Sequence, residues 1–157
     1  DTKASDFPKG QTIGRALVDA ISATGGKGVI APNGKVDSKP DVAIIVLGEK
    51  PYAEFEGDIP HLAFTLQAEE VELIKQLKAK KVPVVVLFLS GRPLFAGKLI
   101  NLADAFVAGW LPGSQGQGVA DVLIAGADGK AHVGLCQGGG VVLTSRNIAI
   151  EGAVLGS

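Results

Sequence analysis

The chain has 157 residues, of which 46% are hydrophobic and 20% charged, and its formal net charge is −1. This length and composition predict one globular domain with a sizeable core, built around a sheet that is covered on both faces. Because the sequence has no basic run and no apolar run of ~18 residues, neither nucleic acid nor a membrane is expected as a partner.

Cysteine and histidine give no sign of a metal site. Cys136 is the single cysteine, so it has no partner for an internal disulfide, and His61 and His132 are far apart and lack neighbours of ligand type. Zinc sites need three or four such side chains close together. We therefore predict no metal, no cofactor and an inert thiol.

Hydrophobic spacing along the chain alternates between helical and strand-like patterns, which is typical of an α/β protein. The predicted elements, in chain order, are a helix at 11–23, a strand at 27–31, a turn at 32–34, a strand at 42–47, a long irregular stretch at 48–66, a helix at 69–80, a strand at 83–89, a strand at 105–108 and a helix that begins at 118–123. Two of the strands, VAIIVL and PVVVLFL, are continuous apolar runs, as expected of central parallel strands. The predicted fold is a single doubly wound, mostly parallel sheet with helices on both faces.

The end of the chain differs from the rest. Residues 131–157 are rich in glycine and in short apolar runs, and here we expect strands at 141–144 and 148–155 and no helix. We expect residues 1–157 to form one domain with a divergent tail at 131–157.

Three loops that follow the central strands carry the candidate site. They are Gly48-Glu49, Ser90-Gly91-Arg92 and residues 110–118. Because the carboxyl ends of parallel strands lie at one edge of a sheet, where such proteins bind ligands, these loops are expected to meet there. The third loop is the most informative, since AFVAGWLPGSQGQGVADV (105–122) is typical of a strand, a turn, a glycine-flanked loop and the start of a helix.

Three segments resemble the second, α/β-sandwich domain of glycoside hydrolase family 3, the exo-acting β-glucosidases and β-glucan hydrolases. DVAIIVLGEKPYAEFEGD (41–58) is similar to the family's strand and GExPYAExxGD loop, VPVVVLFLSGRPL (82–94) to its strand and SGRP loop, and AFVAGWLPGSQGQGVADVLI (105–124) to its acid/base segment. The segments occur in the family's order and at similar spacing, and the resemblance extends over about residues 7–130. Together they make the resemblance specific.

The resemblance implies a carbohydrate-related domain that does not hydrolyse glycosides alone. In the family's acid/base loop, WLPGxEGxG, a glutamate transfers the proton, whereas the matching residue here is Gln115. An amide cannot deliver or take up this proton, and a retaining glycosidase needs two carboxyl groups about 5–5.5 Å apart. The family's barrel domain, which carries the aspartate nucleophile, has no counterpart in these 157 residues.

The family's first strand of this domain, and the GGW loop that follows it and helps to clamp the next sugar, also have no counterpart at the start of the chain. The tail contains the predicted strand at 148–155 and the sequence Gln137-Gly138-Gly139-Gly140, which resembles the GGW loop without its tryptophan. We hypothesise that the tail completes the sheet in place of the missing strand, as a circular rearrangement would.

The candidate site residues come from the three loops. Gln115 is either a sugar-facing amide in an inactivated acid/base loop or an ordinary surface glutamine. Trp110 either stacks its flat face on sugar C–H groups or belongs to the core. Arg92 bridges to Glu49 or to Glu54 and so shapes the first loop. The acidic residues of this loop are either solvated or in direct contact with a ligand. The predicted substrate-binding residues are Trp110, Ser114, Gln115, Glu49, Glu54 and Arg92, with Gln115 at the catalytic position.

Three classes of function stay open. The leading hypothesis is a family 3 domain that binds β-glucan or a glucoside weakly, or that completes an active site with a separate barrel domain. The segment GSQGQG before a helix allows a nucleotide- or phosphate-binding module, although it matches neither GxGxxG nor the P-loop. The third class is a permuted or engineered fragment that self-associates through an open edge or apolar face. For localisation, the family suggests a periplasmic or secreted protein.

Overall fold

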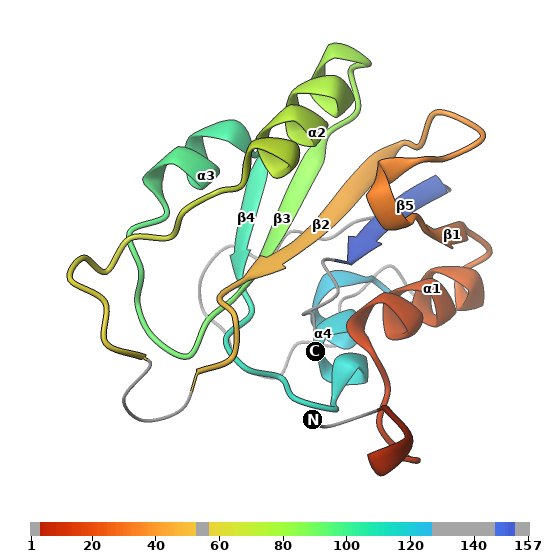
Figure 1. Ribbon diagram of the computed structural model, residues 1–157. Helices are drawn as coiled ribbons and strands as arrows, with labels where there is room; N and C mark the ends of the chain where they lie inside the picture. Colours follow the sequence, from red (N-terminus) through yellow and green to blue (C-terminus); the bar gives the residue numbers. More distant parts are fainter. Residues whose placement is uncertain (1–3, 53–56, 127–146, 153–157) are drawn as a thin grey trace.

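The computed structural model describes residues 4–52, 57–126 and 147–152. Its elements, in chain order, are η1 (Ala4–Asp6), α1 (Ile13–Ala23), β1 (Lys27–Ile30), η2 (Pro32–Gly34), β2 (Val42–Gly48), α2 (Ala68–Ala79), β3 (Val84–Leu89), α3 (Gly97–Leu102), β4 (Ala105–Ala108), α4 (Gly116–Leu123) and β5 (Asn147–Gly152), where η marks a short 3-10 helix. The strands form one parallel sheet in the order β1-β5-β2-β3-β4 (Figure 1). The predicted α/β fold is confirmed. None of the helices in the described part of the chain is long and apolar enough to cross a membrane.

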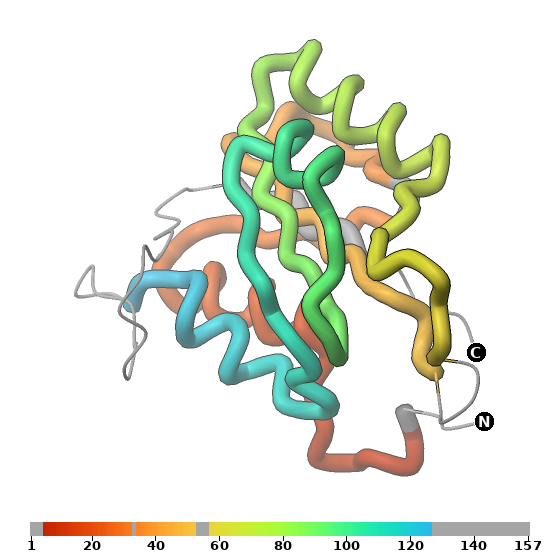
Figure 2. The backbone as a smooth tube through the Cα atoms, turned by 90° about the vertical axis from the view of Figure 1, so that its left-hand side faces the viewer, coloured from red at the N-terminus to blue at the C-terminus, as the bar shows by residue number. Residues whose placement is uncertain are grey.

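The two central strands, β2 and β3, bury both of their faces. On one face, Ile44 and Leu87, both 0% exposed, pack with residues of α1 and α4. On the other face, Ile45 and Val86 pack with residues of α2 and α3. Figure 2 shows the same layers, with α2 and α3 in green on one side of the strands and α4 in cyan on the other. The strands read as unbroken apolar runs because neither face meets solvent.

β5 lies inside the sheet, between β1 and β2. Ala149 is in register with Val29 on one side and with Ala43 on the other. If β5 is counted as the first strand, the order becomes 2-1-3-4-5, which is one of the common doubly wound orders. The strand expected at 148–155 is therefore found at Asn147–Gly152, in the position that this order gives to a first strand. The strand expected at 141–144 lies outside the described residues.

The helix boundaries differ from the predicted ones for local reasons. α1 begins at Ile13 rather than at residue 11, because the Thr12 side chain caps it by accepting a hydrogen bond from the Arg15 N–H at 3.3 Å. α4 begins at Gly116, earlier than the predicted residue 118. α3 has no counterpart among the predicted elements, since it is six residues long and Leu99 is its one buried residue, too little to show a helical period.

Candidate functional site at the carboxyl edge of the sheet

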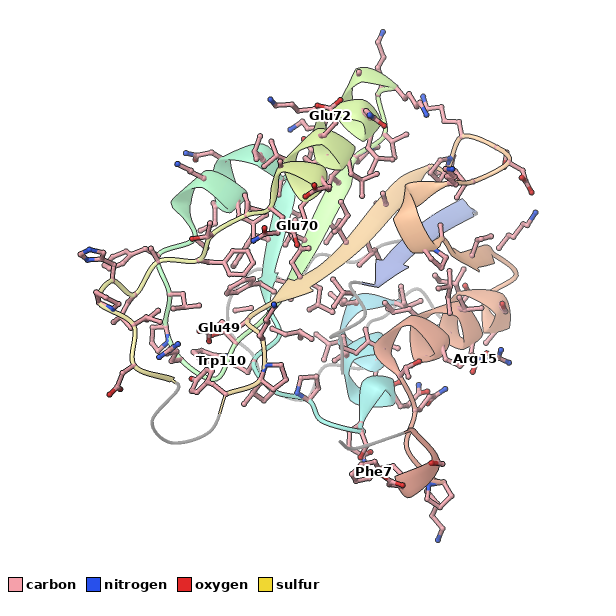
Figure 3. All side chains as sticks on the ribbon, viewed as in Figure 1. Phe7, Arg15, Glu49, Glu70, Glu72 and Trp110 are labelled. Carbon is pink, nitrogen blue, oxygen red and sulfur yellow. The ribbon has the colours of Figure 1, made fainter. Side chains whose placement is uncertain are left out.

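The carboxyl ends of β2, β3 and β4 bring the three predicted loops together. The Glu49 N–H donates to the Leu89 carbonyl at 3.1 Å, and the Ser90 N–H donates to the Trp110 carbonyl at 3.2 Å. Figure 3 shows the Glu49 and Trp110 side chains at the same end of the sheet. The expectation that these loops gather at one edge is therefore confirmed.

A charged network joins the first loop to the second. The Nε and Nη2 groups of Arg92 donate to one oxygen of the Glu49 carboxylate, at 3.0 and 2.7 Å, and the Ser90 hydroxyl lies 2.9 Å from the other oxygen. These side chains are mostly covered, with 21% of the Arg92 and 13% of the Glu49 side chain exposed. Of the two glutamates considered as partners of Arg92, the structure assigns Glu49, and both of its oxygens are engaged.

Arg92 also holds the two ends of the segment between Tyr52 and Gly57. Its Nη1 group donates to the Gly57 carbonyl, and its guanidinium lies over the Tyr52 ring, 4.3 Å from the ring centroid. The hydrogen bond to Glu49 raises the pKa of Arg92 above its ordinary value, so the side chain stays charged. Arg92 therefore fixes the entrance and the exit of this part of the first loop.

Ser90 is the buried polar residue at the centre of this network, with 4% of its surface exposed. Its hydroxyl accepts from the Arg92 N–H at 3.1 Å and has its proton within reach of both Glu49 and the Arg92 carbonyl. We expect Ser90→Ala to lower the free energy of unfolding by about 1–3 kcal/mol, because the largely covered Glu49 carboxylate and Arg92 backbone each lose a hydrogen-bond partner.

Urea unfolding followed by circular dichroism measures this effect, and Ser22→Ala is the matched control. The Ser22 hydroxyl donates to the Val18 carbonyl of its own helix at 2.8 Å in an exposed position. Its removal is expected to change the free energy of unfolding by less than about 0.5 kcal/mol. Equal effects of the two substitutions would contradict the role given to Ser90.

Trp110 begins the third loop in an unusual backbone conformation. Its φ is 51°, in the left-handed region that bulky residues rarely adopt, and 55% of its surface is exposed. Leu111 beside it is 72% exposed, and Tyr52 is 40% exposed. The alternative that Trp110 belongs to the core is wrong, because more than half of its surface is exposed.

Gln115 is the residue directly before α4, and it is exposed. Its N–H donates to the Pro112 carbonyl at 3.0 Å, and its carbonyl accepts from the Gly118 N–H at 3.1 Å. Its side chain makes no capping hydrogen bond to α4. The backbone of Gln115 is thus held by hydrogen bonds within the loop, and the residue is exposed.

The remaining predicted site residues are Ser114 and Glu54. Ser114 is half-buried, and its carbonyl accepts from the Gln11 N–H at 2.9 Å. Glu54 lies outside the described residues, as do His132 and Cys136, so a sugar contact by Glu54 stays a prediction. Within the described ranges, no group of three His, Cys, Asp or Glu side chains is arranged to hold a metal ion.

Two residues of the site are not singled out by sequence reasoning. Tyr52 stacks on Arg92, and its place in the loop that follows Glu49 is the signal from which this contact could have been suspected. Gln11 contacts the Gln115 loop through backbone atoms alone, so no side-chain pattern indicates it.

Comparison with known proteins places the whole arrangement in one family. The family model of the glycosyl hydrolase family 3 C-terminal domain matches residues 5–134. The lysosomal β-glucosidase of Dictyostelium discoideum is 36% identical over 86 residues, which make up 54% of this chain and 10% of that protein. The periplasmic β-glucosidase of Salmonella typhimurium is 34% identical over 84 residues, or 53% of this chain and 11% of that protein.

The fold is shared with an enzyme of known structure. Crystal structures of the exo-1,3/1,4-β-glucanase of a Pseudoalteromonas species, the enzyme itself and a single-residue mutant, match at a TM-score of 0.78 and 50% identity. The matches cover 85% of this chain and 17–22% of those chains, so the chain spans about a fifth of the glucanase length. Because the family model covers most of the chain and the same fold recurs at 50% identity, this chain belongs to glycoside hydrolase family 3 and corresponds to its C-terminal domain.

Proposed function

We propose that this domain binds β-glucan or β-glucosides at the carboxyl edge of its sheet and does not hydrolyse them alone. The observation that carries the proposal is the exposed Trp110, held in a left-handed turn at the start of the loop that contains Gln115. Related proteins are named β-glucosidases and an exo-1,3/1,4-β-glucanase, which supports a glucan as the ligand.

The chemistry of the loop suits a sugar. The flat indole of Trp110 offers an apolar face for sugar C–H groups, and its N–H offers a donor. The Gln115 amide offers both a donor and an acceptor to hydroxyl groups, and the Ser114 hydroxyl offers the same on a smaller scale. Glu49 and Arg92 act in this proposal by holding the first loop in place, with Glu54 as a further predicted contact.

The absence of hydrolysis follows from the residue at the acid/base position. Glycosidic cleavage needs a group that donates a proton to the leaving oxygen, and an amide has no such proton to give. The second carboxyl group of the reaction belongs, in the family, to the barrel domain. We therefore propose that a barrel domain is the protein partner, and that the exposed Tyr52, Trp110 and Leu111 lie on the side that meets it.

Thermal unfolding with two panels of ligands tests the binding proposal. Short β-1,3- and β-1,4-glucan oligosaccharides are expected to stabilise the domain by about 1.4 kcal/mol at ten times the dissociation constant, and nucleotides are expected to have no effect. Trp110→Ala should abolish the stabilisation. Phe95→Ala is the control, because Phe95 is an aromatic residue that is 77% exposed outside the three loops. Stabilisation by nucleotides alone would replace this proposal with a phosphate-binding function.

A further inference from the structure

A short segment before α1 runs beside the loop that leads into α4 (Figure 1). We call this segment, residues 7–12, the strap. The backbones of Gln11 and Gln115 form a parallel bridge, although the two residues lie far apart in the sequence. The Gln11 N–H donates to the Ser114 carbonyl at 2.9 Å, and the Gly116 N–H donates to the Gln11 carbonyl at 3.0 Å. One residue of the strap thus holds the peptide groups on both sides of Gln115.

The contact is so close that it requires glycine at position 116. A Cβ atom at Gly116 would lie 2.5 Å from the Gln11 carbonyl oxygen and 2.6 Å from the Thr12 carbonyl carbon, and both of these are backbone atoms. Flexible side chains can move away from such an atom, but a hydrogen-bonded backbone cannot move without breaking the bridge. Gly118, two positions further along α4, meets nothing within 4 Å at the same test position.

The strap itself is fixed to the body of the domain. Thr12 caps α1, and the Gln11 side chain donates to the Asp19 carboxylate of α1 at 3.0 Å. Helix α1 is anchored in the core by Leu17, which is 0% exposed. The strap therefore links helix α1 to the loop.

The opposite end of the same loop is held by a different element. The Ser90 N–H donates to the Trp110 carbonyl at 3.2 Å, at the end of β3. Between these two attachments, the loop is closed on itself by the hydrogen bond from the Gln115 N–H to the Pro112 carbonyl. The backbone positions of Trp110 and Gln115 are consequently held by Ser90 at one end of the loop and by Gln11 at the other.

We infer that Gln11 is a positioning residue for the ligand-binding loop, acting through its backbone and not through contact with ligand. The inference rests on the proposed glucan site for its functional meaning. The hydrogen bonds between the strap and the loop are present in the free domain, so their effect on the loop can be measured without a ligand. Displacements near 1 Å are enough to weaken a site whose groups must act together.

The test compares Gly116→Ala with Gly118→Ala, which add the same methyl group at two positions of the first turn of α4. In the free domain, hydrogen exchange at the Gln11 and 116 amides is expected to become at least about tenfold faster in Gly116→Ala and to stay unchanged in Gly118→Ala. Glucan affinity, followed by the Trp110 indole resonance, is expected to fall about tenfold in Gly116→Ala alone, at temperatures well below unfolding.

Gly10→Ala provides a second, milder variant in case Gly116→Ala does not fold. Gly10 is exposed, and a Cβ atom there would lie 3.0 Å from the Cβ atoms of both Phe7 and Ser114 and 3.1 Å from the Phe7 carbonyl oxygen. The strap and the loop must therefore shift apart by a few tenths of an ångström. The same changes in exchange and affinity are expected, at smaller size. Unchanged exchange and affinity in both variants would overturn the inference. If no variant, nor the native domain, binds glucan but the exchange rates change as expected, the proposed function fails and the strap stands.

Discussion

Replacing Gln115 by glutamate is expected to raise the hydrolysis of an unactivated β-glucan by about 10²–10⁴-fold when the domain is combined with a barrel domain of the family. The part of the Pseudoalteromonas exo-1,3/1,4-β-glucanase that lies outside the matched region is a suitable partner, because that enzyme shares 50% identity with this chain over the matched residues. The gain comes from restoring a carboxylic acid that protonates the leaving oxygen at the position where the chain has an amide.

The leaving group distinguishes this explanation from a general improvement in folding or assembly. An aryl glucoside with an acidic leaving group needs little protonation, so Gln115→Glu should raise its kcat/KM far less than that of the glucan. The activity of the variant should fall as the pH rises through the pKa of the new carboxyl group, because the acid form is the active one.

Gln117→Glu is the matched control for this substitution. Gln117 is exposed in the first turn of α4, and its side chain donates to Asp121 at 2.7 Å. Gln117→Glu places the same new charge close to the loop but not at the acid/base position, so no gain in hydrolysis is expected. Equal activity of the two variants, or no gain in Gln115→Glu while glucan still binds, would contradict the assignment of Gln115 to that position.

Shortening the chain to end at residue 146 is expected to abolish the cooperative fold. The truncation removes β5, which pairs with β1 on one side and with β2 on the other. β1 has no other pairing partner among the described strands. The loss of both pairings should therefore remove most of the roughly 5–15 kcal/mol by which a domain of this kind is stable.

A chain that ends at residue 152 keeps β5 and serves as the control. Urea unfolding should give a single transition for this chain, similar to that of the full sequence, and no transition for the chain that ends at 146. This experiment tests our proposal that the tail takes the place of the family's first strand, as a circular rearrangement would. An unchanged transition in the shorter chain would mean that β5 contributes little to the sheet.

Much of the fold could be predicted from the sequence because β2 and β3 are buried on both faces. Residues such as Ile44 and Val86 have to be apolar, and continuous apolar runs are the pattern that parallel central strands leave in a sequence. The pairing of Arg92 with a glutamate of the first loop could be predicted for a similar reason, since two opposite charges follow adjacent strands.

Other features depend on geometry that no side-chain pattern records. α3 contains one buried residue, Leu99, and so has no period to recognise. The bridge between Gln11 and Gln115 uses backbone atoms, which every residue has. Trp110 is exposed and has a left-handed φ, a conformation that is not expected of a bulky residue from its type.

The measurement that tests the central claim most directly is a titration of the domain with short β-1,3- and β-1,4-glucan oligosaccharides, followed by nuclear magnetic resonance. The resonances of the Trp110 indole and of the Gln115 side-chain amide are the two probes, because both belong to the loop that the site is built on. We predict that both shift together and saturate with the same affinity. If neither resonance shifts at millimolar ligand, the domain has kept the family fold without its carbohydrate site.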